Sequence, residues 1–170
     1  AERKKIQAQY DQGAVPQYLS QHPAHSEWKV KSIPADLLDR RVEITGPISS
    51  PKMVIQMLSA NQDGEVANTA MLDFEDSMKP SWENVKNGYK NIIGVANKNF
   101  SFVQDDGKVY QLNANKMAHP MVRVRGLHLF EKNILANNQP IAGGFLDLAV
   151  TAFHTAKVFL ADKKTPKFYV

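Results

Sequence analysis

Short apolar runs and longer helical repeats alternate along most of this chain. Apolar or β-branched runs closed by turn residues or acids predict strands at residues 41–45, 69–74, 121–125 and 167–170. Apolar positions that recur every three or four residues predict helices at residues 53–59, 81–93 and 143–161, and a short polar helix is expected at residues 3–11, ended by Gly13 and Pro16. Strands that alternate with helices favour βαβ units and a parallel sheet, so the pattern predicts an α/β protein.

The connections and the last helix add detail to this pattern. The turn Asp105-Asp106-Gly107 between two apolar stretches predicts an inserted β-hairpin near residues 100–112. Three prolines predict that residues 16–36 are mostly extended or looped. In the last helix, one face is shared by the apolar residues Phe145, Leu148, Ala149, Ala152, Phe153 and Ala156, and we expect this face to pack.

Composition excludes several classes of protein. The chain has 170 residues, a formal net charge of +4 and no cysteine. Such a chain has no disulfides, no thiolate zinc ligands and no thiol nucleophile. Its surplus of Lys and Arg lies partly at the two ends, and no basic stripe interleaved with aromatic residues indicates nucleic-acid binding. No apolar run approaches the roughly 18 residues of a membrane span, so we expect a globular domain with neither a nucleic-acid nor a membrane partner.

Acidic residues close the apolar run at residues 69–74, in the sequence Asp73-Phe74-Glu75-Asp76-Ser77. Carboxylates so close together repel one another unless a cation or an arginine lies among them. Carboxylate oxygens are ligands for Mg²⁺, which usually keeps several of its waters, and acids at the ends of parallel strands often line sites. Alternatively, Asp76 or Ser77 only caps a turn or the following helix.

Two arginines close the next candidate strand, in the sequence Arg123-Val124-Arg125-Gly126. Alternation along a strand places Arg123 and Arg125 on the same side. An arginine there can bind a small carboxylate substrate or stabilise a developing oxyanion. Alternatively, it forms a structural ion pair with the strand-end acids, and both interpretations can hold, one for each arginine. Lys52, just before the helix at residues 53–59, can reach a phosphate.

These residues and several longer runs resemble one known family, the malate synthases, and within it the bacterial A isoform and its glyoxysomal relatives. The runs that carry the resemblance are Trp28-Lys29-Val30, Ile33-Pro34-Ala35-Asp36-Leu37, Asp39 to Pro47, Lys52 to Ile55, Asp73 to Ser77, Gly107 to Leu112, Arg123 to Leu129, Glu131-Lys132, the helix at residues 145–156, and Phe168-Tyr169. They follow the order of the family and cover nearly the whole chain.

The resemblance implies a fold and an activity. Malate synthases are TIM barrels with appended domains, and they condense acetyl-CoA with glyoxylate and water to give malate and CoA, using Mg²⁺. The implied fold is α/β, a partial TIM (β/α)8 barrel with an inserted β-hairpin. Residues 1–66 are then expected to lead into the barrel, and residues 67–170 to form its first part, about three strands.

The resemblance also implies roles for single residues. Arg123 is implied to be the catalytic arginine, which contacts glyoxylate and stabilises the enolate of acetyl-CoA. Asp73 and Glu75 are implied to lie beside the metal and its waters rather than to be its main ligands. Those ligands and the catalytic aspartate base are expected beyond the end of this chain. Lys52 falls where the family places a basic residue near the adenine and phosphates of CoA.

The chain also departs from the family pattern. Phe130 stands where proline is usual, Asn133 stands where histidine is usual, and residues 62–69 resemble a small insertion. A TIM barrel needs about 250 residues, so we expect this chain to be a piece of a longer protein and inactive by itself.

The alternatives are a truncated, non-catalytic family member that serves as a binding or interaction module, and a related Mg²⁺-dependent CoA-ester lyase. An open sheet edge favours association, so we expect a homo-oligomer or pairing with the remainder of the protein. The expected location is the cytoplasm of a bacterium, or the glyoxysome or peroxisome of a eukaryote.

Overall fold

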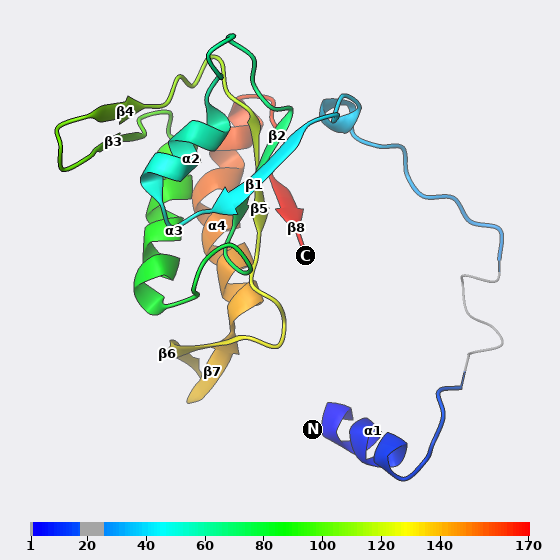
Figure 1. The fold of residues 1–170 in the computed structure, drawn as a ribbon. Coiled ribbons are helices and arrows are strands. Elements are labelled where there is room, and N and C mark those ends of the chain that lie inside the picture. Colours follow the sequence, from blue (N-terminus) through cyan, green and yellow to red (C-terminus); the bar gives the residue numbers. More distant parts are fainter. Residues whose placement is uncertain (1, 18–25) are drawn as a thin grey trace. The chain divides into compact units, whose positions relative to one another are not determined.

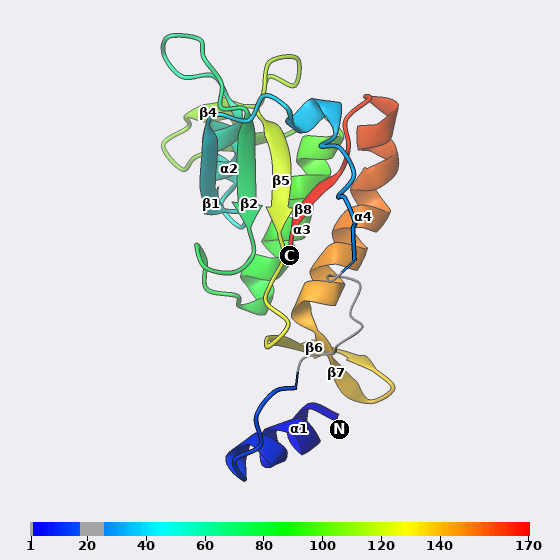
Figure 2. The same cartoon turned by 90° about the vertical axis from the view of Figure 1, so that its right-hand side faces the viewer.

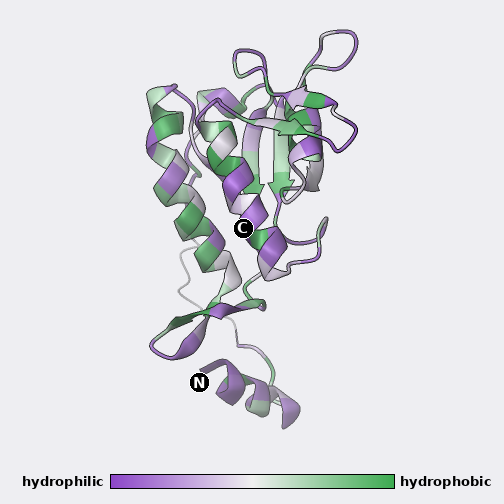
Figure 3. Cartoon of the chain, turned by 90° about the vertical axis from the view of Figure 1, so that its left-hand side faces the viewer, coloured by the Kyte–Doolittle hydropathy of each residue, from purple (hydrophilic) through white to green (hydrophobic). Residues whose placement is uncertain are grey.

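The computed structural model describes residues 2–17 and 26–170, which belong to two compact units, residues 1–33 and 34–170 (Figure 1). In the first unit, helix α1 (Glu2–Asp11) confirms the helix predicted at residues 3–11; it buries no side chain and is mostly hydrophilic (Figure 3). Of the proline-rich stretch 16–36, residues 18–25 lie outside the described residues. The described remainder has no regular element apart from the start of a short 3-10 helix, η2 (Ala35–Leu37).

The second unit is built on a four-stranded parallel sheet. Its strands are β1 (Glu43–Pro47), β2 (Thr69–Asp73), β5 (His119–Arg123) and β8 (Lys167–Tyr169), and they lie side by side in chain order. The helices α2 (Pro51–Leu58), α3 (Trp82–Ala96) and α4 (Gly143–Ala161) all lie on one face of this sheet (Figures 1 and 2). Helices on a single face and strands in sequential order are the arrangement of a (β/α) barrel. The predicted α/β partial barrel is therefore confirmed, as an open sheet.

The sheet contains one more strand than the three expected from residue 67 onward. Strand β1 pairs in parallel with β2, with Glu43 opposite Thr69 and Pro47 opposite Asp73. The side chain of Asn68 accepts hydrogen bonds from the backbone N–H groups of Arg41 and Val42, which ties the start of β1 to β2. The strand predicted at residues 41–45 is therefore present as β1, but it was not expected to belong to the barrel sheet. Its first residues are exposed because β1 lies at the edge of the sheet.

The core lies between the sheet and the three helices. The fully buried apolar side chains there include Ile48, Val54, Leu58, Leu72, Phe74, Val85 and Ile92, and the strands at this core are coloured as hydrophobic in Figure 3. Burial of a side chain of this size stabilises the fold by about 1.5–3 kcal/mol. Helix α3 approaches the end of β2 closely at Gly88, where a Cβ would lie 2.4 Å from the Phe74 ring.

Two antiparallel hairpins project from the helical layer. The predicted hairpin is present as β3 (Ser101–Val103) and β4 (Val109–Gln111). A second hairpin, β6 (Phe130–Ala136) and β7 (Gln139–Ala142), was not predicted. Its turn residues Asn137 and Asn138 have φ values of 50° and 59°, the left-handed conformation that a two-residue hairpin turn needs and that asparagine tolerates.

The prediction that the apolar face of α4 packs against the rest of the domain is wrong. Phe145 and Phe153 are exposed, Phe153 by 83%, whereas the buried positions of this helix include Asp147, Thr151 and Thr155. The buried face of α4 therefore combines these polar residues with Leu146 and Phe159, and Asp147 neutralises a buried arginine there. Among the described helices, α4 is also the one long and apolar enough to cross a membrane by length and composition, which alone is weak evidence for a membrane partner.

Candidate functional site

The carboxyl ends of β2 and β5 bring the predicted acids and one arginine together. Asp73 and Arg123 are paired positions at the ends of these adjacent strands. Arg123 Nη2 lies 2.8 Å from Glu75 Oε2 and 2.6 Å from Asp76 Oδ2, while Arg123 Nη1 lies 3.6 Å from Asp73 Oδ2. An arginine thus lies among the three carboxylates, as their mutual repulsion requires. We call Arg123 with Asp73, Glu75 and Asp76 the strand-end cluster.

The acids of the strand-end cluster differ in how firmly they are held. The Asp73 side chain is 1% exposed, and its two oxygens accept the backbone N–H groups of Glu75 and Ser77. Glu75 is 18% exposed and accepts the N–H of Gly126. Asp76 is 70% exposed, and Arg123 is its partner. Asp73 and Glu75 are therefore held by the backbone as well as by Arg123, and Asp76 is the most exposed of the three acids.

The strand-end acids were expected to lie beside a metal ion rather than to be its main ligands. Among the residues that the structure describes, no three His, Cys, Asp or Glu side chains are placed to hold a metal ion. Asp73 and Glu75 direct oxygens to backbone N–H groups and to Arg123. A carboxylate oxygen has more than one lone pair, which leaves these acids able to accept hydrogen bonds from the waters of a neighbouring ion.

Arg123 remains charged and borders a cavity. Burial lowers the pKa of its guanidinium, but the hydrogen bond to Asp76 and the charge of Asp73 outweigh burial and raise the pKa above its ordinary value. The guanidinium also lies over the ring of Tyr169, 5.7 Å from its centre. A cavity of about 330 Å³ adjoins Arg123, and Glu75, Gly126, Leu127 and Tyr169 are among its lining residues. The site can therefore present a fixed positive charge to a small anion.

Arg125 has a different set of partners and is almost completely buried. Its backbone N–H, Nε and Nη2 donate to the Asp147 carboxylate at 2.9–3.0 Å, and Nη1 donates to Glu131 at 2.9 Å. Tyr89 donates its hydroxyl to Asp147 at 2.6 Å. Burial and the charge of Asp147 raise the pKa of the Tyr89 hydroxyl, which keeps it protonated. We call Arg125, Asp147, Glu131 and Tyr89 the Arg125 network.

The Arg125 network joins residues from four parts of the fold. Tyr89 lies on α3, Asp147 on α4 and Glu131 on β6, while Arg125 follows β5 directly. A Cβ at Gly144 would lie 2.3 Å from the carbonyl oxygen of Arg125, so only glycine lets α4 begin this close to β5. Of the two interpretations left open for the arginines, a wholly structural ion-pair role therefore describes Arg125, although its partners are not the strand-end acids.

Lys52 lies outside the strand-end cluster and contacts the first hairpin. Its Nζ donates to Gln104 Oε1 at 2.9 Å and lies 5.2 Å from the centre of the Tyr110 ring. Lys108 Nζ also lies 5.2 Å from the same ring centre. Two ammonium groups therefore flank one aromatic ring on this part of the surface.

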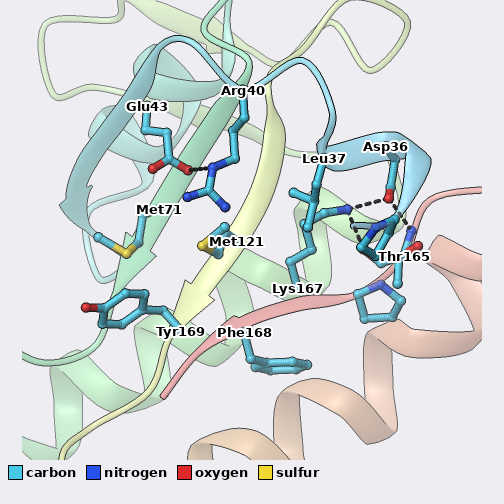
Figure 4. Close-up of a pocket in the computed structure, with 12 residues that line it drawn as sticks. Asp36, Leu37, Arg40, Glu43, Met71, Met121, Thr165, Lys167, Phe168 and Tyr169 are labelled. Carbon is cyan, nitrogen blue, oxygen red and sulfur yellow. Dashed lines mark hydrogen bonds and ion pairs between the residues drawn. The ribbon is translucent and has the colours of Figure 1, made fainter. Parts of the chain in front are cut away.

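A second cavity opens toward the amino ends of the same sheet face. It measures about 380 Å³, and its lining residues include Met71, Met121 and Lys167 (Figure 4). Lys167 Nζ donates to Asp36, the hydrogen bond that holds the pKa of Asp36 at about 2, and lies 3.1 Å from His119 Nε2. Burial and the neighbouring ammonium lower the pKa of His119. The ion pair between Lys167 and Asp36 joins η2 to β8, and we interpret it as a structural contact.

Sequence reasoning missed Asp147, Glu131 and Tyr89 as the partners of Arg125. The available signal was Asp147 itself, a single acid in an otherwise apolar stretch of helix, since a buried carboxylate requires a cation. It also treated Asp76 only as one of three acids or as a cap, whereas this residue makes the shortest contact with Arg123.

Comparison with known proteins agrees with the fold. Residues 120–170 match the family model of the malate synthase TIM barrel domain. The chain is 41% identical over 172 residues to malate synthase A of Escherichia coli (strain K12). This alignment covers 100% of this chain and 31% of that protein. It is 42% identical to a malate synthase of Myxococcus xanthus over 99% of this chain and 30% of that protein. A glyoxysomal malate synthase of Candida tropicalis is 38% identical, again over 99% of this chain and 30% of its own length.

The similarity covers the whole chain, and the chain spans about 30% of the length of these curated relatives. The relatives include both bacterial and glyoxysomal proteins. Over its whole length the chain is therefore similar to malate synthases, as a segment that enters their TIM barrel domain.

Proposed function

We propose that this chain supplies the glyoxylate-binding arginine of a malate synthase, which condenses acetyl-CoA with glyoxylate and water to give malate and CoA. The observation that carries the proposal is the position of Arg123, at the carboxyl end of a barrel strand and beside a cavity. Active sites of TIM barrels are built at this end of the strands. The guanidinium binds the carboxylate of glyoxylate, because its paired N–H donors match two carboxylate oxygens.

The strand-end cluster also suits the second task of the arginine. When the acetyl methyl group loses a proton, negative charge develops on the thioester oxygen. A fixed guanidinium nearby lowers the energy of that enolate, and needs no reorganisation if it is already held in place. Asp73 and Glu75 hold it from the protein side. The base that removes the proton lies outside the described residues in this proposal.

Magnesium and CoA belong to the same proposal. Mg²⁺ bound to the whole protein would supply a Lewis acid for the carbonyl of glyoxylate, and Asp73 and Glu75 would be placed to accept hydrogen bonds from its waters. Lys52 contacts the phosphates of CoA, a role supported by the neighbouring ammonium of Lys108 beside Tyr110. The location follows the source of the protein, cytoplasm in a bacterium and glyoxysome or peroxisome in a eukaryote.

The function is tested by a thiol-release assay on the full-length protein that contains this chain, with acetyl-CoA, glyoxylate and Mg²⁺. Arg123→Lys keeps the charge but loses the paired donors, so we expect activity to fall by about two to three orders of magnitude. Arg41→Lys is the matched control, because Arg41 is exposed and pairs only with Asp39 among the described residues. The 170-residue chain alone is expected to release no thiol.

Wild-type activity in the Arg123→Lys protein would refute the role of Arg123, and rapid turnover by the isolated chain would refute the need for residues outside it. An active full-length protein that releases thiol only with a different aldehyde or oxo acid would replace malate synthesis by the reaction of a related CoA-ester lyase.

A further inference from the structure

The carboxylate of Asp76 contacts the guanidinium of Arg123 as a small carboxylate ligand would. Its Oδ2 lies 2.6 Å from Arg123 Nη2, the shortest of the three ion pairs at this guanidinium. Its side chain is 70% exposed, whereas those of Asp73 and Glu75 are 1% and 18% exposed. The most exposed of the three acids, and the one in shortest contact with the arginine, therefore bears the same functional group as the proposed substrate.

Asp76 is also the acid that can leave most easily. Asp73 and Glu75 are tied to the backbone by hydrogen bonds from Glu75, Ser77 and Gly126. Within the described part of the chain, Arg123 is the one partner of the Asp76 carboxylate. An exposed ion pair contributes only about 0.2–1 kcal/mol, so its exchange for another carboxylate costs little, whereas exchange of Asp73 would break a buried arrangement.

The charge of the strand-end cluster makes this exchange relevant to binding. Three carboxylates surround one guanidinium, so the formal charge is −2 before any substrate anion arrives. Each of the three repels a glyoxylate carboxylate. Glu75 and Asp76 both contact Nη2 of Arg123, and Asp76 is much the more exposed of the two.

We propose that Asp76 is an internal competitor that holds Arg123 in the empty site and is displaced when the carboxylate of glyoxylate binds. This inference rests on the proposed function, since it assigns Asp76 a role at the same arginine. Asp76 then determines how much of a small carboxylate is needed to fill the site. It keeps the guanidinium in one orientation between turnovers and excludes anions that bind more weakly than it does.

The test is the Asp76→Asn variant of the full-length protein in the thiol-release assay. The amide keeps the shape of the side chain and removes its charge, so the KM for glyoxylate is expected to fall about two- to fivefold, the range that corresponds to an exposed ion pair. The KM for acetyl-CoA is expected to remain unchanged. Since salt screens exposed charges, the KM values of variant and wild type for glyoxylate should converge in high salt, an effect that a merely structural role does not produce.

Asp39→Asn is the matched control, because it removes an equally exposed carboxylate that pairs with Arg41 instead; its KM for glyoxylate is expected to equal that of the wild type. Asp76→Ser serves as a second variant that also removes the charge. An unchanged or higher KM for glyoxylate in both Asp76 variants would overturn the proposal. If Arg123→Lys is inactive in the same assay, that result leaves the proposed function standing, whereas an active Arg123→Lys protein contradicts the function itself.

Discussion

The Arg125 network makes Asp147 one of the positions on which the fold depends most. The Asp147→Ala variant removes the acceptor of three hydrogen bonds from Arg125 and of one from Tyr89. It leaves a buried guanidinium with Glu131 as its remaining carboxylate. Removal of one partner of a buried ion pair costs about 3–5 kcal/mol, because the other charge stays desolvated. A domain of this size is stabilised by about 5–15 kcal/mol in total, so the variant should lose a large share of its stability.

The assay is urea unfolding of the 170-residue chain, followed by far-ultraviolet circular dichroism and compared at equal m values. Asp162→Ala is the matched control, since Asp162 pairs with the exposed Lys98 and its loss should cost less than about 1 kcal/mol. The triple variant Arg125→Met with Asp147→Leu and Glu131→Leu should recover much of the loss, because it removes all three buried charges of the network together. An equally small loss for Asp147→Ala and Asp162→Ala would refute the reasoning.

Two further predictions concern pH and CoA. Because the folded protein lowers the pKa of His119 below 6.5, the unfolded chain takes up a proton first as the pH falls, and stability present above pH 6.5 is lost as the pH drops through the folded pKa. The unfolding free energy of the wild type should therefore fall more between about pH 7.5 and about pH 5 than that of His119→Gln; equal slopes would contradict this. Replacement of both Lys52 and Lys108 by alanine should raise the KM for acetyl-CoA but not for glyoxylate in the full-length protein, and an unchanged KM for acetyl-CoA would exclude the proposed phosphate contact.

Much of the fold follows from local sequence signals. Ser81 accepts the N–H of Asn84 at the start of α3, and the run that ends at Asp73 forms a buried parallel strand. The first hairpin forms around Gly107, whose φ of +82° explains the glycine. Each of these signals acts over a few residues, so a single sequence suffices to detect it.

Features that depend on distant partners could not be found in this way. The exposed face of α4 carries Phe145 and Phe153, which look like core residues until Asp147 is known to pair with Arg125. The second hairpin was not predicted, because it is largely exposed and lacks alternating apolar residues; its Asn137-Asn138 turn was the one local signal available. The ends of β2 and β5 were expected to carry chemistry, but which arginine meets the acids depends on the register between strands.

The central claim is that Arg123 is the residue to which glyoxylate binds. The most direct test is a crystal structure of the full-length protein with glyoxylate bound. We predict that the glyoxylate carboxylate lies within hydrogen-bond distance of the Arg123 guanidinium, that Asp73 and Glu75 keep their contacts, and that Asp76 has moved away. Glyoxylate bound elsewhere, with Arg123 still held by all three acids, would contradict the account.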